Sequence, residues 1–322
     1  MTEIEVLAPG LLTTVQDLGR QGYGPMGVSP SGAADPTALR LGNRLVGNPE
    51  GTAALEMTLL GGTFLFREPA TIALAGSDFG ATLDGNPLAC WTSAEARSGQ
   101  TLRVGPTRSG ARCYLCIGGG IVVEPFLGSA STHLLSGLGG FEGRALRKGD
   151  LLSCGQGSAF QLRTLRLGLF GEERRARVSA LHLARRTLRL TPGPQSDWFP
   201  EPVHRLLYES AYRVSEESNR MGLRLQGPAL QAARSAGEMI TEGISLGAIQ
   251  VPDSGQPIIS FVEQQTTGGY PVIANVISPD LSSVGQLRPR DEIRFQSVEF
   301  AAARALLIEQ EKLLASPDLI LE

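Results

Sequence analysis

Short apolar runs separated by turn residues fill the first part of the chain and restrict what it can fold into. They follow one another from Ala54 to Gly120 with no helical period between them. The runs are Thr63–Phe66, Thr71–Ala75, Thr101–Val104 and Cys113–Ile117. Glycine-containing turns such as Gly61-Gly62 separate them, which is typical of consecutive strands. This spacing favours an antiparallel sandwich or barrel.

Composition agrees with a turn-rich, two-domain protein. The chain has 322 residues, and its 40 glycines and 20 prolines make up close to a fifth of it. The net charge is −3 and no basic stripe occurs, which argues against nucleic acid or an anionic membrane surface as a partner. The first ten residues lack the pattern of a secretory signal, and no apolar run reaches membrane-spanning length. We therefore expect a cytoplasmic protein.

Two helices and a domain boundary can be placed. Asp35 as N-cap, Pro36 after it and Gly47 at the end predict a helix over 35–47. A second helix is predicted over Ser297–Leu314, capped by Ser297. Alternation is lost near 160–187, where we place the boundary. The predicted parts are a β-rich module over 1–165, a barrel over 187–298, and a helix and tail over 299–322.

The pair Cys113 and Cys116 resembles half of a zinc knuckle. On a strand, residues three apart point to opposite faces, so the two sulfurs cannot reach one metal ion. No second such pair exists among the four cysteines. We therefore interpret both as core residues, and no metal site is predicted.

The stretch Gln256–Asp280 contains the strongest site candidate. Two strand-like runs, Pro257–Val262 and Pro271–Ile277, enclose the polar loop Glu263–Tyr270. Loops held between core strands often carry functional sites. We expect Gly268-Gly269 to turn the chain through positive φ. The alternative is an ordinary hairpin with a polar tip. The candidates from this loop are Gln265, Thr266 and Thr267 as catalytic residues, and Gly268, Gly269 and Tyr270 as substrate-binding residues.

Further candidates are scattered along the chain. They are neutral donors, carboxylates and arginines that lie beside glycines or at strand ends, and a histidine that could carry a proton. Asp17 and Glu242 are candidate catalytic carboxylates; Gln16, Arg20, His133, Asn219, Arg220 and Gln250 are candidate substrate-binding residues. The alternatives are a surface connector around Asp17 and a hydrogen-bonding loop residue at His133.

A weak internal echo suggests two barrels of similar topology. A strand, a glycine-rich loop and the turn before Leu151 in the first half are echoed before Glu292 in the second. Glycine and aspartate turns before strands are common, so the echo is of low specificity.

Several motifs together resemble a known family. They are Thr14–Arg20, Ser31–Asp35, Asn43–Asn48, Leu55-Glu56, Gly128–His133, Gly193–Asp197, Asn219–Leu225 and Gln265–Pro271. They are similar to subunit 2 of the allophanate hydrolase/urea carboxylase carboxyltransferase family, which includes the C subunit of 5-oxoprolinase and KipA. The resemblance runs from about Val6 to Phe295.

This resemblance implies a mainly β (α+β) chain: two cyclophilin-like β-barrel modules with a few peripheral helices. It also implies a hetero-oligomer with two companion 5-oxoprolinase chains, the B subunit (KipI-like) and the A subunit. In this reading ATP, with Mg as a candidate companion ion, drives opening of the 5-oxoproline lactam, a small-molecule amide substrate. Two positions depart from the family pattern. Glu263-Gln264 stands where an Asp and a basic residue are expected, and Arg290 stands where the family has Gly.

Three functions remain open at this point. The first is a 5-oxoprolinase subunit that is inactive alone; without a Walker motif, its ATP site would be shared with a partner. The second is transfer of a carboxyl group to urea or a related amide, with biotin carried on another chain. The third is a KipA-like regulatory binding protein, because no complete nucleophile–His–acid set is evident.

Overall fold

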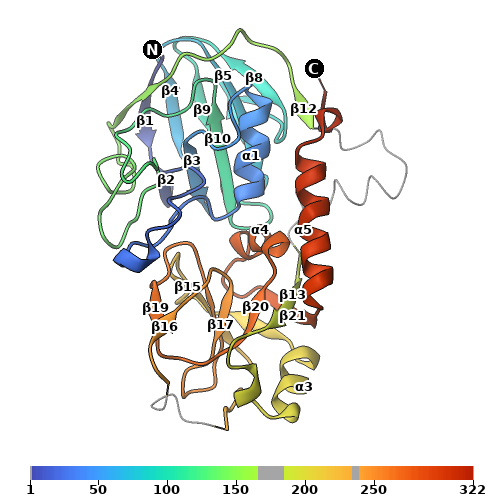
Figure 1. Ribbon diagram of the computed structural model, residues 1–322. Coiled ribbons are helices and arrows are strands. Elements are labelled where there is room, and N and C mark those ends of the chain that lie inside the picture. The colour runs from blue at the N-terminus through green and yellow to red at the C-terminus, as the bar shows by residue number, and fades with distance from the viewer. Residues whose placement is uncertain (1, 166–184, 234–238, 322) are drawn as a thin grey trace. The chain divides into compact units, whose positions relative to one another are not determined.

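The computed structural model describes residues 2–165, 185–233 and 239–321, and it divides into two compact units (Figure 1). Unit 1 comprises Met1–Arg20, Ser31–Leu183 and Leu313–Glu322; unit 2 comprises Gln21–Pro30 and Ala184–Lys312. The predicted division by contiguous segments is therefore too simple. Most of the expected boundary region lies outside the described residues.

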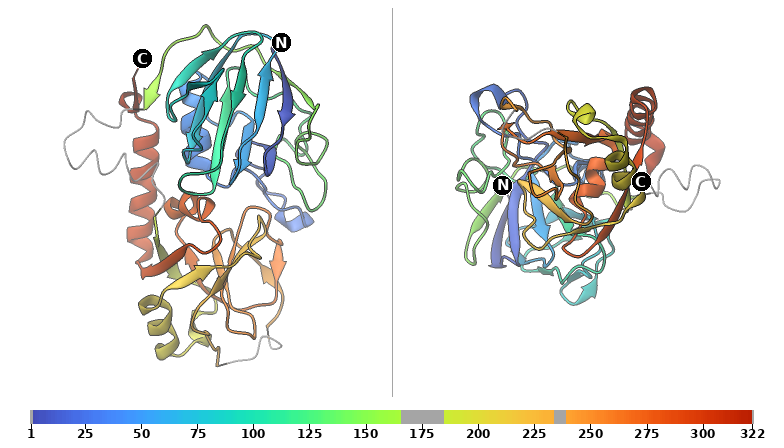
Figure 2. Two further views of the ribbon diagram at one scale, coloured as in Figure 1. Left: turned by 180° about the vertical axis from the view of Figure 1, so that it is seen from behind. Right: turned by 90° about the horizontal axis from the view of Figure 1, so that it is seen from below.

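Unit 1 contains two antiparallel sheets. The first has the order β11-β1-β4-β9-β6-β7 and the second the order β2-β3-β10-β5-β8. The strands of the first are β1 (Thr2–Ala8), β4 (Thr63–Phe66), β6 (Thr82–Leu83), β7 (Asn86–Pro87), β9 (Thr101–Arg103) and β11 (Leu151–Cys154). Those of the second are β2 (Leu12–Gln16), β3 (Ala54–Thr58), β5 (Ala70–Gly76), β8 (Ser93–Ala96) and β10 (Arg112–Ile117). The left view of Figure 2 shows unit 1 from behind, where the strands within its sheets run side by side.

The main core of unit 1 lies between these two sheets. Ile4 and Phe64 from one sheet and Leu55 and Cys113 from the other belong to a single buried cluster. Among the described residues, these strands thus form two sheets packed as a sandwich, one of the two arrangements that the strand spacing favours. The sandwich already satisfies the apolar faces of both sheets, so they need no closure to be buried.

Helix α1 (Pro36–Leu45) covers the outer face of the second sheet (Figure 1). The predicted cap is confirmed, because Asp35 Oδ1 accepts a hydrogen bond from Ala38 N at 3.0 Å. Cys116 packs under this helix whereas Cys113 faces the sandwich core. The two thiols therefore point to opposite faces as predicted, and burial raises the pKa of both.

Unit 2 is built on a closed barrel with the order β13-β20-β17-β18-β15-β14-β21, in which β13 and β21 pair in parallel to close it. The strands are β13 (Thr187–Pro192), β14 (Tyr212–Val214), β15 (Gly222–Gln226), β17 (Ala248–Gln250), β18 (Ile258–Ser260), β20 (Val272–Val276) and β21 (Glu292–Ser297). This confirms the predicted C-terminal barrel. In unit 1 the strand after the similar turn, β11, instead pairs with β1 in antiparallel orientation.

Short elements complete the two units. They are η1 (Gly24–Met26), β12 (Thr164–Leu165), η2 (Ser196–Trp198), α3 (Glu201–Glu209), β16 (Glu242–Gly243), β19 (Thr267–Gly268), η4 (Ser278–Asp280), α4 (Leu281–Gly285), η5 (Pro317–Leu319) and β22 (Ile320–Leu321). Within the described ranges, no helix has both the length and the apolar character to cross a membrane.

The C-terminal segment corrects two expectations. Helix α5 (Phe300–Leu314) begins three residues later than predicted, because Ser297 still pairs with Leu190 at the end of β21. The residues beyond it do not form a separate tail. Leu314 and Leu319 pack in the apolar cluster under α1, and β22 pairs with β12.

Arg290 occupies a position that favours glycine. Its φ is +72°, in the left-handed region that costs an L-residue about 1–2 kcal/mol. We expect Arg290→Gly to raise the free energy of unfolding by up to about 1 kcal/mol, part of the gain being lost to the greater freedom of glycine in the unfolded chain. Urea unfolding of both proteins measures this. Arg290→Ala is the matched control: it removes the exposed ion pair with Glu216 yet keeps a Cβ, so it should not stabilise.

Candidate functional site

A pocket of about 300 Å³ lies against the barrel of unit 2. It is lined by residues from three strands, from the turn before β15 and from the loop between β18 and β20. They are Asn219, Met221, Gly222, Arg224, Gln250, Ile258, Ser260, Gln264, Gln265, Gly268, Gly269 and Tyr270. Six of these twelve are sequence-predicted site residues.

Strand register explains why the pocket floor is on the outside of the barrel. Ile259 pairs with Leu223 on one side and with Ile249 on the other, and all three are buried in the interior. Alternate residues of a strand point to the opposite face. The next row, Arg224–Ile258–Gln250, therefore faces outward.

The loop after β18 forms the wall over this floor. It does not join a simple hairpin, since β18 and β20 each pair with β17 rather than with one another. Its segment β19 pairs instead with β16, where Gly268 lies opposite Glu242. The loop is thus tied down by a second small sheet.

Gly268 serves this wall by close packing and not by an unusual turn. Neither it nor Gly269 has a positive φ, contrary to the sequence-based expectation. A Cβ on Gly268 would clash with Ile244 Cδ1 and would lie 3.0 Å from Gln250 Oε1. The absence of a side chain therefore lets the wall approach the floor of the pocket.

Two glutamines fix the polar groups at the base of the pocket. Gln250 Nε2 donates to Ser260 Oγ at 2.7 Å. This bond links the row Arg224–Ile258–Gln250 to the next outward-facing row, in which Ser260 pairs with Gly222. Gln264 Nε2 donates to the Ile244 carbonyl at 2.9 Å. Gln264 is 7% exposed, and its Oε1 has no hydrogen-bond partner in the part of the chain that the structure describes.

Arg220 and Glu263 lie behind the pocket and do not line it. They are 5% and 3% exposed, and the Arg220 guanidinium donates to the Glu263 carboxylate. Glu263 N also donates to the Arg220 carbonyl at 2.8 Å. This double link joins the start of the loop to the turn before β15, so the geometry favours a supporting role for Arg220 over substrate contact.

The proposed catalytic residues of the loop are only partly at the pocket. Gln265 lines it, whereas Thr266 and Thr267 do not. Thr267 is exposed and pairs with Gly243 in the β16–β19 sheet. Glu242 is exposed as well, and its Oε2 accepts from Gln195 Nε2 at 3.1 Å.

The remaining candidates belong to unit 1, where Asp17 is the centre of a hydrogen-bond network. Its Oδ1 accepts from Ser129 Oγ at 2.6 Å and Ser131 Oγ at 2.5 Å. Its two oxygens also accept from the backbone N–H groups of Gly19 and Ala130, each at 2.7 Å. A carboxylate with four donors holds two loops together, so this geometry favours a structural role.

The residues around Asp17 are similarly engaged. Gln16 Nε2 donates to Thr14 Oγ1 at 3.0 Å and to the Thr132 carbonyl at 3.1 Å. The Arg20 guanidinium donates to the Ser131 carbonyl and lies 5.5 Å from the centre of the Phe126 ring. His133 is 7% exposed, and its Nδ1 accepts from Ser136 N at 3.1 Å. This arrangement fits the alternative of a hydrogen-bonding loop histidine.

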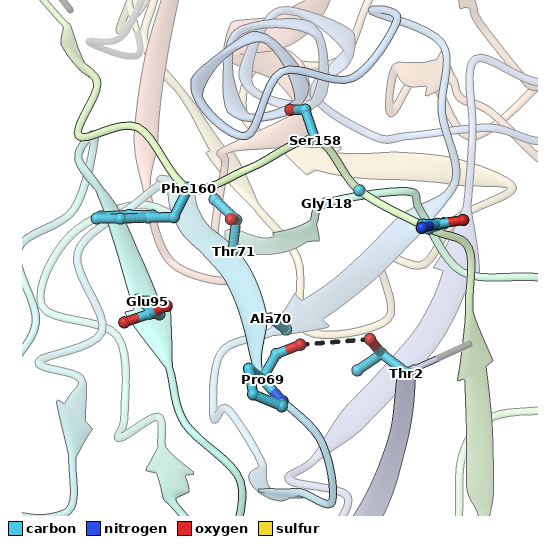
Figure 3. Close-up of a pocket in the computed structure, with 10 residues that line it drawn as sticks. Thr2, Pro69, Ala70, Thr71, Glu95, Gly118, Ser158 and Phe160 are labelled. Carbon is cyan, nitrogen blue, oxygen red and sulfur yellow. Dashed lines mark hydrogen bonds between the residues drawn. The ribbon is translucent and has the colours of Figure 1, made fainter.

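A second pocket, of about 390 Å³, lies in unit 1 (Figure 3). Its lining combines hydroxyl groups of Thr2, Thr71 and Ser158 with the Glu95 carboxylate and the exposed Phe160 ring. In Figure 3, Phe160 and Glu95 lie on one side and Thr2, which donates to the Pro69 carbonyl at 3.4 Å, lies on the other. None of the sequence-predicted site residues lines it.

The described residues contain no group of three or more His, Cys, Asp or Glu side chains that could hold a metal ion. Sequence reasoning missed Arg224, Ser260 and Gln264 as pocket residues. The alternation Leu223-Arg224-Leu225 does indicate that Arg224 points outward. Which outward residues lie beside it depends on strand pairing that no local pattern shows.

Comparison with known proteins places this geometry in context. The family described as carboxyltransferase domain, subdomain A and B, matches residues 26–297. The chain is 37% identical over 313 residues to the 5-oxoprolinase C subunit of Escherichia coli K12, covering 96% of this chain and 95% of that protein. It is 35% identical over 308 residues to the protein of the same name in Haemophilus influenzae, with the same coverage.

A solved structure, the K. lactis urea amidolyase, superposes with a TM-score of 0.89 at 34% identity. The match covers 99% of this chain but only 21% of that protein. The fold of the whole chain is therefore also found as one part of a much longer enzyme.

Proposed function

Because this chain belongs to the carboxyltransferase domain family, subdomains A and B, we propose that it acts as the C subunit of an ATP-dependent 5-oxoprolinase. The observation that carries the proposal is the match to two proteins of that name over 95% of their own length. Urea amidolyase of Saccharomyces cerevisiae is 35% identical, but the chain spans only 18% of it. We therefore take 5-oxoproline hydrolysis as the first candidate function and carboxyl transfer as the second.

The chemistry of the unit 2 pocket is consistent with an amide substrate. Its lining offers the neutral amides of Asn219 and Gln265 and the Tyr270 hydroxyl, which can donate to a carbonyl oxygen or accept from an N–H group. An amide carbonyl is a weak electrophile, and phosphorylation of its oxygen would make that oxygen a leaving group. In this proposal the chain binds and orients the amide for that step.

The same pocket does not fit a nucleoside triphosphate. It offers a single cation, Arg224, and its volume of about 300 Å³ is at the lower end for small-molecule sites. Triphosphates are held by several positive charges and by backbone N–H groups of a phosphate loop. We therefore assign ATP, with any Mg, to the companion A and B subunits or to an interface with them, and derive no step of this chain through it.

This proposal predicts that activity requires the assembled complex. The purified chain alone should release no ADP and form no glutamate from 5-oxoproline and ATP, because the groups that hold ATP lie on other chains. Co-purification with its companion subunits should give 5-oxoproline-dependent ATP hydrolysis, measured as ADP and glutamate in equal amounts.

Three results would contradict it in different ways. Turnover by the single chain would exclude a shared site. Activity that needs urea and a biotin carrier protein would instead support carboxyl transfer. A tight complex that remains inactive with every amide tested, and changes the activity of a kinase, would support a KipA-like regulator.

A further inference from the structure

We propose that Arg224 is the specificity residue of the unit 2 pocket and that it binds the carboxylate of an amide acid. This inference rests on the proposed function and deepens it, since it states how the pocket selects 5-oxoproline over neutral amides. Arg224 lies on the outward floor of the pocket, paired with Ile258 across the sheet.

The first argument for this assignment is the charge of the residues that line the pocket. Arg224 is the single charged residue among the twelve that line it. Several other arginines of unit 2 face a carboxylate; for example, Arg189 contacts Asp280 and Arg290 contacts Glu216. For the Arg224 guanidinium, the described residues supply neither an ion pair nor a hydrogen bond. A guanidinium in a pocket without acidic groups favours an anionic ligand.

The backbone of Arg224 is held in place by the turn that precedes β15. Its N–H donates to Ser218 Oγ at 3.0 Å, and its carbonyl accepts from Ser215 N at 2.8 Å. The residue is thus fixed in β15 at both its polar backbone groups. Only the side chain remains to adjust to a ligand.

A second group of the pocket matches the N–H group of such a ligand. Gln264 Nε2 donates one of its two hydrogens to the Ile244 carbonyl, and Gln264 Oε1 is an acceptor without a partner among the described residues. A lactam presents one N–H donor. In 5-oxoproline this N–H group is bonded to the carbon that bears the carboxylate, so the ligand presents a donor for Gln264 and an anion for Arg224, two residues of the same lining.

The volume of the pocket distinguishes between two sources of an anion, a substrate carboxylate and an ATP phosphate. A carboxylate on a five-membered lactam is small enough for a pocket of about 300 Å³. A phosphate of ATP would bring a nucleoside with it and calls for more cations than one. We therefore assign the anion as the carboxylate of the amide substrate and treat the ATP phosphate as an outcome of the test.

The test compares 5-oxoproline with 2-pyrrolidinone, the same lactam without its carboxylate, on the complete complex. We expect the wild type to prefer 5-oxoproline in kcat/KM. Arg224→Gln should raise KM for 5-oxoproline about 10- to 100-fold, the range for loss of one charge-assisted hydrogen bond, and leave 2-pyrrolidinone nearly unchanged. Arg224→Lys should have a KM for 5-oxoproline between those of the wild type and Arg224→Gln. Arg213→Gln, on the neighbouring strand β14 and outside the pocket lining, is the matched control.

An unchanged preference for 5-oxoproline in Arg224→Gln would overturn the inference while the proposed function stands. A rise in KM for ATP alone would overturn it too, by assigning the anion to a phosphate. If the complex fails to hydrolyse 5-oxoproline, the proposed function falls. The inference is then decided by calorimetric titration of the full chain with both lactams: binding of 5-oxoproline that depends on Arg224 upholds it, and equal or absent binding overturns it.

Discussion

Glu263→Ala is expected to lower the free energy of unfolding of unit 2 by about 3–5 kcal/mol, the usual cost of breaking a buried ion pair by removing one partner. The variant leaves the Arg220 guanidinium, 5% exposed, without the carboxylate to which it donates. It also loosens the link between the turn before β15 and the loop that walls the pocket. Hydrogen exchange measured by mass spectrometry on peptides from β15 and β18 reports this unit separately from unit 1.

Two further variants make the result specific. Arg220→Met combined with Glu263→Leu should recover much of the loss, because an apolar pair of similar volume is often as stable as a buried ion pair. Glu216→Ala is the matched control, since it removes the partner of Arg290 in a pair whose side chains are 79% and 64% exposed. That change should cost less than about 1 kcal/mol. A stable Glu263→Ala protein that has lost turnover would instead indicate that this carboxylate takes part in catalysis.

The Arg220–Glu263 pair also explains a departure from the family pattern noted in the sequence. Glu263-Gln264 stands where the family pattern has an Asp and a basic residue. In the structure the Glu263 carboxylate forms a buried ion pair with Arg220, whereas Gln264 lines the pocket. The first residue of the departure is thus structural, and the second is the one that can affect the ligand.

Local patterns predicted much of the fold for identifiable reasons. The Asp35 cap and the alternation that places Cys113 and Cys116 on opposite faces depend on neighbours within a few residues. Arg290, where the family has Gly, has a φ of +72°, in the left-handed region that favours glycine. Such features need no knowledge of which strands pair.

The site was less predictable because long-range pairing builds it. The row Arg224–Ile258–Gln250 joins residues that are tens of positions apart, and it exists only through the register of β15, β18 and β17. Sequence reasoning chose Thr266 and Thr267 for their hydroxyl groups. In β19, Thr267 pairs with Gly243 of β16 and does not line the pocket, whereas the next residue, Gly268, does.

Asp17→Ala is the second change with a large expected effect, on unit 1. Asp17 accepts hydrogen bonds from two buried serines, Ser129 and Ser131, and from the N–H groups of Gly19 and Ala130. Bonds to a charged acceptor contribute about 1.5–3 kcal/mol each and are not additive. We therefore expect a loss of about 2–4 kcal/mol in the free energy of unfolding, and a smaller loss for Asp17→Asn, which keeps the shape of the side chain.

A matched control separates the network from the local turn. Asp78 Oδ1 accepts from Gly80 N at 2.7 Å, the same two-residue turn that Asp17 makes with Gly19, but Asp78 is exposed and its other partner is the exposed Arg108. Asp78→Ala should therefore cost less than about 1 kcal/mol. Urea unfolding, with hydrogen exchange at residues 129–133, measures the stability lost in Asp17→Ala and in Asp78→Ala. If Asp17→Ala is as stable as Asp78→Ala but the assembled complex loses turnover, the Asp17 carboxylate acts in catalysis. If the stability of Asp17→Ala falls as expected and Asp17→Asn retains turnover, the role of Asp17 is to hold the loops around residues 17–19 and 129–131 together.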